Sequence, residues 1–359
     1  MESEMVNRAG KRVVVIGAGI VGASLAYHLA GKGANVTLVE AEDIASGVTG
    51  TSFAWINASH SEPDPIEQLR GAAIPEYHRL ETELPDLAIR WTGSLSYSAN
   101  LDEGTPDIQS SANLISRSRI LDLVPNLKNP SQHAVYVAEE GALEAVQATH
   151  VLIAGAEAHG AKVLTHTQVV GFTIRNAKVT GVETVTGIIE ADIVVLAAGT
   201  GITQLTETLK MPLPIEASPA IFIRYKTQSN LMNTIISSPD MEVRQGSEGT
   251  LLAAEDYLGE AGENQPMAIA LRTARAIQNE LHGVVSIEPE VACVGLRPMP
   301  SDGIPIVGYL LDIGGAYVCT MHPGVALAAV VGRLASEEII DNTLSPALAP
   351  CHPKRFFRT

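Results

Sequence analysis

Two short apolar runs near the N-terminus flank a glycine-rich turn. Residues 12–16 read Arg-Val-Val-Val-Ile and continue directly into residues 17–22, Gly-Ala-Gly-Ile-Val-Gly. Residues 23–30 have helical spacing, and a second apolar run at residues 36–39 ends at Glu40. An uninterrupted apolar run is typical of a strand that is buried on both faces. The order of strand, glycine turn, helix and strand therefore predicts a βαβ unit with parallel strands.

The rest of the chain mixes long helical patterns with shorter strand patterns. Apolar spacing predicts helices within residues 63–84, 143–159, 268–281 and 325–340. Short apolar or alternating runs predict strands at residues 91–97, 135–137, 162–170, 172–190, 192–199, 220–225, 250–254 and 316–319. The second half lacks the regular strand-helix alternation of a doubly wound sheet. We therefore expect an α/β (α+β) chain in which a Rossmann-like unit is only one part.

The glycine turn has the spacing of a dinucleotide-binding motif. Gly17 permits the tight turn, Gly19 lets a pyrophosphate approach the backbone, and Gly22 lets helix and strand pack closely. The free N–H groups at Ile20 and the rest of the new helix start attract phosphate. Glu40 follows Gly22 by eighteen residues, where a carboxylate can accept both hydroxyls of an adenosine ribose. An acid there repels the 2′-phosphate of NADP, so the motif favours FAD or NAD.

Composition narrows the classes of function. A length of 359 residues predicts two domains, and the net charge of −16 disfavours binding to nucleic acid or to anionic membranes. No apolar run outside the motif region approaches the length of a membrane span. The three cysteines, Cys293, Cys319 and Cys351, and the scattered histidines form no metal-ligand pattern. We expect a cytoplasmic protein with no metal site.

Further anchors follow the motif along the chain. A loop rich in glycine and hydroxyl groups, residues 45–52, follows Glu40, and a second buried strand ends at Ala198-Gly199. A Gly-Leu-Arg-Pro sequence spans residues 295–298, and His322-Pro323-Gly324 opens the last predicted helix. Small residues allow a backbone to approach a ligand, and hydroxyl groups can bond phosphate or ring atoms.

In this order the anchors resemble the D-amino-acid oxidase superfamily of FAD-dependent oxidoreductases, in particular its glycine oxidase and sarcosine oxidase-like branch. The resemblance implies an FAD-binding domain from residues 1–60, 140–215 and 290–359, and a mostly antiparallel substrate domain from residues 61–139 and 216–289. It also implies that FAD is bound without a covalent link, because the position where sarcosine oxidase-like members carry a cysteine is Gly295. The residues implied to contact FAD are Gly17, Gly19, Ile20, Gly22, Glu40, Ala41, Ser46, Thr49, Ser52, Phe53, Ala54, Val169, Ala198, Gly199, His322, Gly324 and Val325.

The resemblance implies oxidation of a C–N bond in an amino acid or related amine. A hydride passes from the carbon beside the amine to flavin N5, and the resulting imine hydrolyses. Arg297 is the first candidate for the substrate carboxylate, because a guanidinium fork suits bidentate pairing. His322 can bond substrate or flavin, or add positive charge if it is protonated. His60 and Tyr257 are further candidates for the substrate pocket.

The sequence departs from the family pattern around the expected active site. Ala217-Ser218-Pro219-Ala220 replaces a strand that usually carries a glycine, and Cys319-Thr320 replaces a usual Gly-His. An auxiliary, non-catalytic flavoprotein subunit of a larger complex is therefore the alternative function. The sequence leaves open whether O2 or another acceptor takes the electrons, and whether the chain forms a homo-oligomer.

Overall fold

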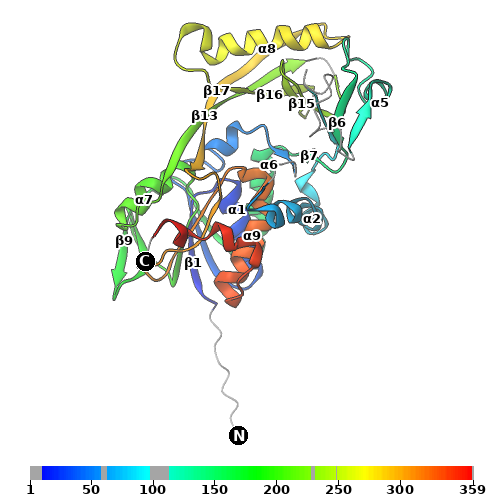
Figure 1. Ribbon diagram of the computed structural model, residues 1–359. Coiled ribbons are helices and arrows are strands. Elements are labelled where there is room, and N and C mark those ends of the chain that lie inside the picture. The colour runs from blue at the N-terminus through cyan, green and yellow to red at the C-terminus, as the bar shows by residue number, and fades with distance from the viewer. Residues whose placement is uncertain (1–9, 58–62, 98–112, 228–230, 248, 358–359) are drawn as a thin grey trace.

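The computed structural model describes residues 10–57, 63–97, 113–227, 231–247 and 249–357. The chain forms an upper part and a lower part that are joined by long strands (Figure 1). None of the helices in these ranges combines the length and the apolar character needed to cross a bilayer. The mixture of a parallel sheet with antiparallel sheets confirms the expected α/β (α+β) class.

The lower part is built on a six-stranded sheet with the order β18-β19-β12-β1-β2-β8. All neighbours are parallel except β18 and β19. The strands are β1 (Arg12–Ile16), β2 (Asn35–Val39), β8 (Lys162–Leu164), β12 (Ile193–Leu196), β18 (Ile306–Tyr309) and β19 (Ala316–Thr320). Along β1, Val13 and Val15 face one core while Val14 and Ile16 face another. The continuous apolar run at β1 is thus explained by burial on both faces.

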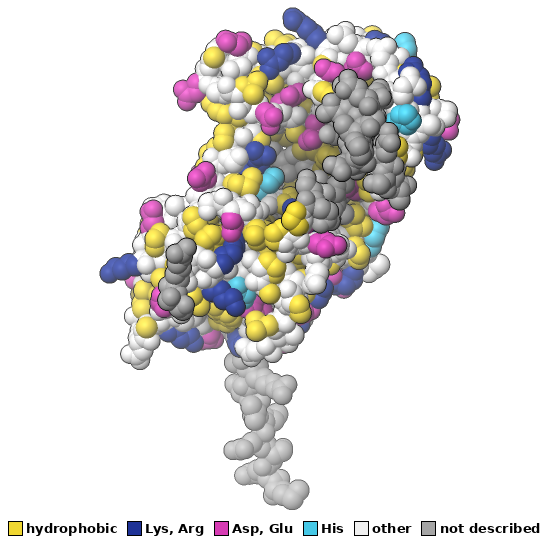
Figure 2. Space-filling view, in the orientation of Figure 1, with side chains coloured by type: hydrophobic (Ala, Val, Ile, Leu, Met, Phe, Trp, Pro, Cys, Tyr) yellow, Lys and Arg dark blue, Asp and Glu magenta, His cyan; other side chains and the backbone are white. Residues whose placement is uncertain are grey.

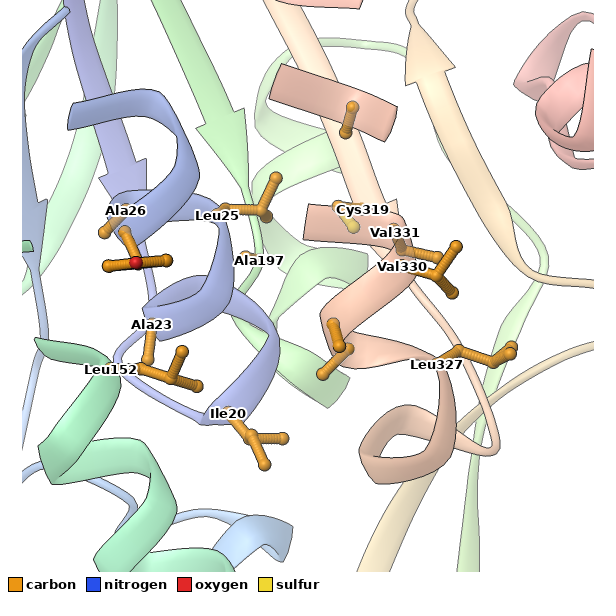
Figure 3. Close-up of a cluster of buried hydrophobic side chains, with 14 of the residues drawn as sticks. Ile20, Ala23, Leu25, Ala26, Leu152, Ala197, Cys319, Leu327, Val330 and Val331 are labelled. Carbon is orange, nitrogen blue, oxygen red and sulfur yellow. The ribbon is translucent and has the colours of Figure 1, made fainter. Parts of the chain in front are cut away.

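Helices cover one face of this sheet. They are α1 (Ile20–Gly31), α6 (Ala145–Ala158) and α9 (Gly324–Asp341), with α2 (Glu67–Glu83) packed against α9. Figure 3 shows Ile20, Ala23 and Ala26 of α1 between Leu152 of α6 and Val330 of α9. Small residues permit this close packing, and a Cβ placed on Gly332 would meet Ser24 Oγ at 2.2 Å. The Ser24 hydroxyl donates to the carbonyl of Ala328 across the helix pair.

The opposite face of the six-stranded sheet carries a smaller layer. It consists of a three-stranded antiparallel sheet, the helix α7 (Ile202–Thr208) and neighbouring loops. The strands are β9 (Val169–Arg175), β10 (Lys178–Thr184) and β11 (Gly187–Glu190). The predicted β-rich segment at residues 172–190 is therefore confirmed.

The upper part is an eight-stranded sheet with the order β17-β13-β16-β15-β14-β4-β6-β5. All neighbours are antiparallel except β14 and β4. One face packs against α8 (Pro266–Glu280), and α5 (Arg117–Leu123) lies at the far end (Figure 1). The strands are β4 (Ser94–Ser96), β5 (Leu114–Ser116), β6 (His133–Val137), β13 (Ile215–Thr227), β14 (Ile235–Ser237), β15 (Glu242–Gln245), β16 (Thr250–Asp256) and β17 (Ile287–Pro300).

The two longest strands, β13 and β17, run from the lower part into the upper part (Figure 1). The short strands β3 (Trp55–Ile56) and β7 (Gly141–Ala142) pair with each other. Along the chain, β3 comes between β2 of the lower sheet and β4 of the upper sheet, and β7 comes between β6 of the upper sheet and β8 of the lower sheet. We propose that the two domains expected from the sequence correspond to the two large sheets. The helix α2 packs in the lower part, because its Leu69, Tyr77 and Leu80 are buried in the hydrophobic core of that part.

Candidate functional site

A cavity of about 840 Å³ extends from the glycine turn before α1 to the inner face of the eight-stranded sheet. Its volume falls in the range of small-molecule and cofactor sites. Residues from β1, β2, β3, β9, β13, β15, β16, β17, β19, the segment after β12 and the start of α9 line it. Figure 2 shows a recess between the upper and lower parts of the molecule.

The glycine turn at the cavity has the close contacts that a phosphate cradle needs. Gly17 has a positive φ of 105°, which an L side chain rarely adopts. A Cβ on Gly22 would meet the carbonyl oxygen of Gly17 at 1.9 Å, so helix and turn touch directly. Gly19 caps α1 through its backbone, and the first helical N–H, at Ile20, donates to Thr49 Oγ1. This hydrogen bond holds Thr49 at the N-terminus of α1.

Glu40 lies at the end of β2 beside this turn. Its Oε2 accepts the N–H of Ala18 at 2.7 Å, and its Oε1 accepts the N–H of Glu42 at 3.0 Å. Both bonds fix the carboxylate in the cavity wall and leave it further acceptor sites. The placement is the one that ribose binding requires.

The residues expected to contact FAD come together at the cavity with one exception. Gly22 is not in the lining, because it packs against Gly17. The lining includes Gly17, Gly19, Ile20, Glu40, Ala41, Ser46, Thr49, Ser52, Phe53, Ala54, Val169, Ala198, Gly199, His322, Gly324 and Val325.

The start of α9 faces the cavity with unused polar groups. No side chain caps the helix, and its first turn carries no acid. Thr320, just before it, is buried, lines the cavity, and its Oγ1 has no hydrogen-bond partner. Free N–H groups at a helix start carry partial positive charge, and a buried unpaired hydroxyl is costly unless a ligand completes it. These features suit the polar edge of a bound ring system.

Arg297 lies on β17 at the opposite side of the cavity. Its Nη2 donates to Ser218 Oγ at 3.0 Å, and longer contacts reach the carbonyl oxygens of Ser218 and Pro219. Within the described ranges it forms no ion pair, so a structural salt bridge does not account for it. The guanidinium is thus oriented by β13 and keeps donors for an anion.

A family model with the description FAD dependent oxidoreductase matches residues 12–338. The chain belongs to the DAO family. This membership decides between the two dinucleotides in favour of FAD and confirms the resemblance drawn from the motifs. The chain is an FAD-dependent enzyme of the amine and amino-acid oxidase class.

Relatives cover almost the whole chain. Glycine oxidase of Pseudomonas putida is 26% identical over 92% of this chain and 96% of its own length. The solved L-amino acid deaminase of Proteus myxofaciens superposes with a TM-score of 0.86 at 17% identity, covering 98% and 94% of the two chains. L-proline dehydrogenase of P. horikoshii superposes with a TM-score of 0.84 at 22% identity, covering 97% and 98%. The likeness to these two structures concerns the fold.

His322 lines the cavity of this DAO-family chain close to Arg297. Burial, Arg297 and Arg70 lower the pKa of its imidazole to about 4. The ring is therefore neutral at physiological pH, which removes the expectation that it contributes positive charge. It can still donate one hydrogen bond and accept another.

Tyr257 and His60 are the other two candidates for the substrate pocket. Tyr257 is partly buried against the core beneath α8 and is absent from the lining, so its expected contact with substrate is not supported. His60 lies outside the described residues. Arg244 is buried and donates hydrogen bonds to the carbonyls of Phe53 and Leu143. It therefore links β15 of the upper sheet to the segment around Phe53 that lines the cavity.

A titratable residue that the sequence reasoning missed also lines the cavity. Glu242 on β15 is half-buried there, and burial, with Glu255 and Asp256 nearby, raises the pKa of its carboxyl to about 7. The only pattern that hinted at it is the alternation in residues 241–245. Met241 and Val243 point into the core, so Glu242 must point to the other face.

Proposed function

We propose that this protein oxidises the C–N bond of an amino acid or related amine and releases an imine that hydrolyses in water. The observation that carries the proposal is the placement of Arg297, an arginine without an ion-pair partner in the described ranges, in the same cavity as the dinucleotide motif. The 26% sequence identity to glycine oxidase of Pseudomonas putida supports the reaction class.

The lining fits FAD. The turn at Gly19 and the start of α1 would hold the pyrophosphate through backbone N–H groups, and Glu40 would bind the ribose. Thr320 Oγ1 and the N-terminal amides of α9 would bind the polar edge of the flavin. When bound, FAD supplies the two-electron acceptor for a hydride from the carbon beside the amine.

We further propose that FAD is held without a covalent bond. A Cβ on Gly295 would already approach Thr51 Oγ1 at 2.5 Å, and Gly295 itself has no nucleophile. Cys293, two residues earlier, is absent from the cavity lining. Cys319 does line it, but burial raises the pKa of its thiol, so the reactive thiolate is not formed.

The protein's own groups bind and orient the substrate. Arg297 pairs with the carboxylate through its guanidinium, which Ser218 keeps in place from the neighbouring strand. The neutral imidazole of His322 offers a hydrogen bond without adding charge next to Arg297. The residues of β13 and β17 that line the cavity would form the wall beside the bound substrate.

The test is anaerobic reduction of the purified yellow protein. The flavin absorbance is followed while glycine, sarcosine, proline and a series of D- and L-amino acids are added. Loss of the oxidised band with one class of amine supports the proposal. Readmitting air then separates an oxidase, whose band returns, from a dehydrogenase that needs another acceptor.

The opposite outcome is equally informative. If flavin is present and no amine bleaches it, amine oxidation is wrong, and an auxiliary flavoprotein subunit becomes the better description. Release of the flavin on denaturation, measured in the same samples, tests the non-covalent attachment.

A further inference from the structure

Glu242 occupies a defined place on the cavity wall. In the paired strands, Glu242 on β15 lies opposite Ala254 on β16, which lies opposite Phe222 on β13. All three residues line the cavity, as does Ala220 two positions along β13. Directly opposite residues share a face of a sheet, so this row forms one wall with the acid at its end.

The wall separates Glu242 from Arg297 by a long distance. Cys293 continues the row on β17, and Arg297 lies four residues further along that strand. With a strand spacing of about 4.8 Å and a rise of about 3.3 Å per residue, the two Cα atoms are about 20 Å apart on a flat sheet. The ammonium and carboxylate of one α-carbon are far too close together to reach both side chains. Glu242 therefore does not bind the reacting amine of a substrate held at Arg297.

The surface between the two charges is apolar. Phe222, Ala254 and Ala220 provide it, and each lines the cavity. Methylene groups gain free energy by lying on such a surface. A substrate with about four to six atoms between its carboxylate group and its cationic group, and a hydrogen bond of about 2.9 Å at each end, can extend from the guanidinium toward the carboxyl if both side chains lean inward.

No cation neutralises Glu242 within the described residues. It forms no ion pair there, and the charged groups that act on it, Glu255 and Asp256 from β16, are both acids. The hydroxyl of Ser237 on β14 is its polar neighbour. A carboxyl in this setting gains most from a positively charged partner.

We propose that Glu242 determines specificity by binding a cationic group, an ammonium or guanidinium, at the far end of a long substrate whose carboxylate is bound by Arg297. The proposal rests on the proposed amine oxidation and names its substrate class: amino acids, or N-substituted amino acids, with an extended cationic side chain. The apolar wall accommodates the methylene groups between the two charged ends.

The test compares matched pairs of substrates that differ in one charge. Arginine is compared with citrulline, and lysine with norleucine, each as both enantiomers, by the rate of anaerobic flavin reduction and by kcat/KM. The holoenzyme should prefer the cationic member by about 30-fold or more. The Glu242→Gln variant keeps the shape of the side chain and should bring this ratio close to one while the values for neutral substrates change little.

A charge control and a binding measurement complete the design. Asp240→Asn removes one negative charge two residues away, in an exposed turn outside the cavity, and should preserve the ratio. Binding of 6-aminohexanoate is compared with that of hexanoate by calorimetry, because neither has an α-amine to be oxidised. Wild type should bind the amino acid more tightly, and Glu242→Gln should bind both alike.

The outcomes separate the two proposals. If no amine reduces the flavin but 6-aminohexanoate still binds preferentially through Glu242, amine oxidation fails and the cation site stands. If amines reduce the flavin but cationic substrates and ligands have no advantage, or Glu242→Gln weakens both members of each pair equally, the role of Glu242 is wrong and the oxidation stands.

Discussion

The two ends of the cavity are built in different ways. At the end beside α1, the groups that line the cavity are glycines, backbone N–H groups, the hydroxyl of Thr49 and the carboxylate of Glu40, all within residues 17–52. At the other end, the polar groups are the side chains of Arg297, His322 and Glu242. These three come from β15, β17 and the segment before α9, which line one cavity only in the folded chain.

Because of this difference, the two ends are suited to recognise different molecules. Backbone groups recognise a phosphate or ring edge that is the same in every FAD molecule, so that end needs a fixed conformation. Side chains at the substrate end can change without disturbing the sheet, and the departure at Ser218, which contacts Arg297, is found there. Substitutions at the first end should therefore affect fold and cofactor together, and those at the second should change substrate binding while FAD binding stays intact.

The largest expected effect is at the first end. Gly22→Val should destabilise the protein by at least about 3 kcal/mol and remove FAD, because its Cβ would meet the carbonyl oxygen of Gly17 at 1.9 Å. Thermal unfolding and the ratio of flavin to protein measure this. Gly31→Ala is the control in the same helix, since its Cβ makes only ordinary contacts with His159. Full flavin content in Gly22→Val would show that close packing at the turn is dispensable.

The sequence predicted the helices around the first end well because their determinants are local. The helices expected at residues 143–159 and 325–340 are found at Ala145–Ala158 and Gly324–Asp341, since a long periodic pattern marks a buried helical face. The strand β17 was missed, because Pro289 and two later prolines argue against a strand. It tolerates them as the edge of its sheet, where a missing N–H disturbs no second neighbour.

The substrate end was predicted only in part. Arg297 was chosen as a candidate because it belongs to a recognisable run of four residues, Gly-Leu-Arg-Pro, and the structure places it in the cavity lining. Glu242 is one acid among many in the sequence, and its position depends on β15 pairing with β16 and on β16 pairing with β13. No local pattern carries such a sequence of pairings. The neutral state of His322 likewise depends on burial and on two arginines that are distant in the sequence.

The second prediction is for the substrate end alone. Arg297→Met should raise KM for carboxylate-bearing amines about 100-fold, because a bidentate charged contact is lost, while the flavin content stays at the wild-type level. Steady-state kinetics and flavin absorbance measure the two quantities. Arg224→Met, on β13 but outside the cavity lining, is the matched control. Unchanged KM and kcat in Arg297→Met would remove the carboxylate assignment.

The third prediction concerns stability at the substrate end. Burial raises the pKa of Glu242 to about 7, so the folded state favours the protonated carboxyl and loses stability as pH rises from the unfolded pKa toward 7. Glu242→Gln cannot ionise and avoids this loss. The variant should be about 2 kcal/mol more stable than wild type at pH 8, with no difference near pH 4.

Denaturant unfolding of both proteins at several pH values measures the effect. Asp240→Asn, whose carboxyl is exposed, should follow the wild-type curve. A constant difference between Glu242→Gln and wild type at every pH would mean that packing, and not ionisation, explains it. If Glu242 has a binding role, we expect it to lower the stability of the fold, because residues kept for function are often not the most stable choice at their position.

The smallest effects should come from glycines that touch neither end of the cavity. Gly71 lies in α2 with open space around its added Cβ, so Gly71→Ala should stabilise the protein by about 0.5–1 kcal/mol through helix propensity. Gly33 has equally open space but a positive φ of 82°, so Gly33→Ala should destabilise it by about 1 kcal/mol. Thermal unfolding should show opposite shifts, with flavin content and KM unchanged in both. A change in flavin content in either variant would mean that the cofactor end depends on the global stability of the fold, and its separation from the substrate end would then fail.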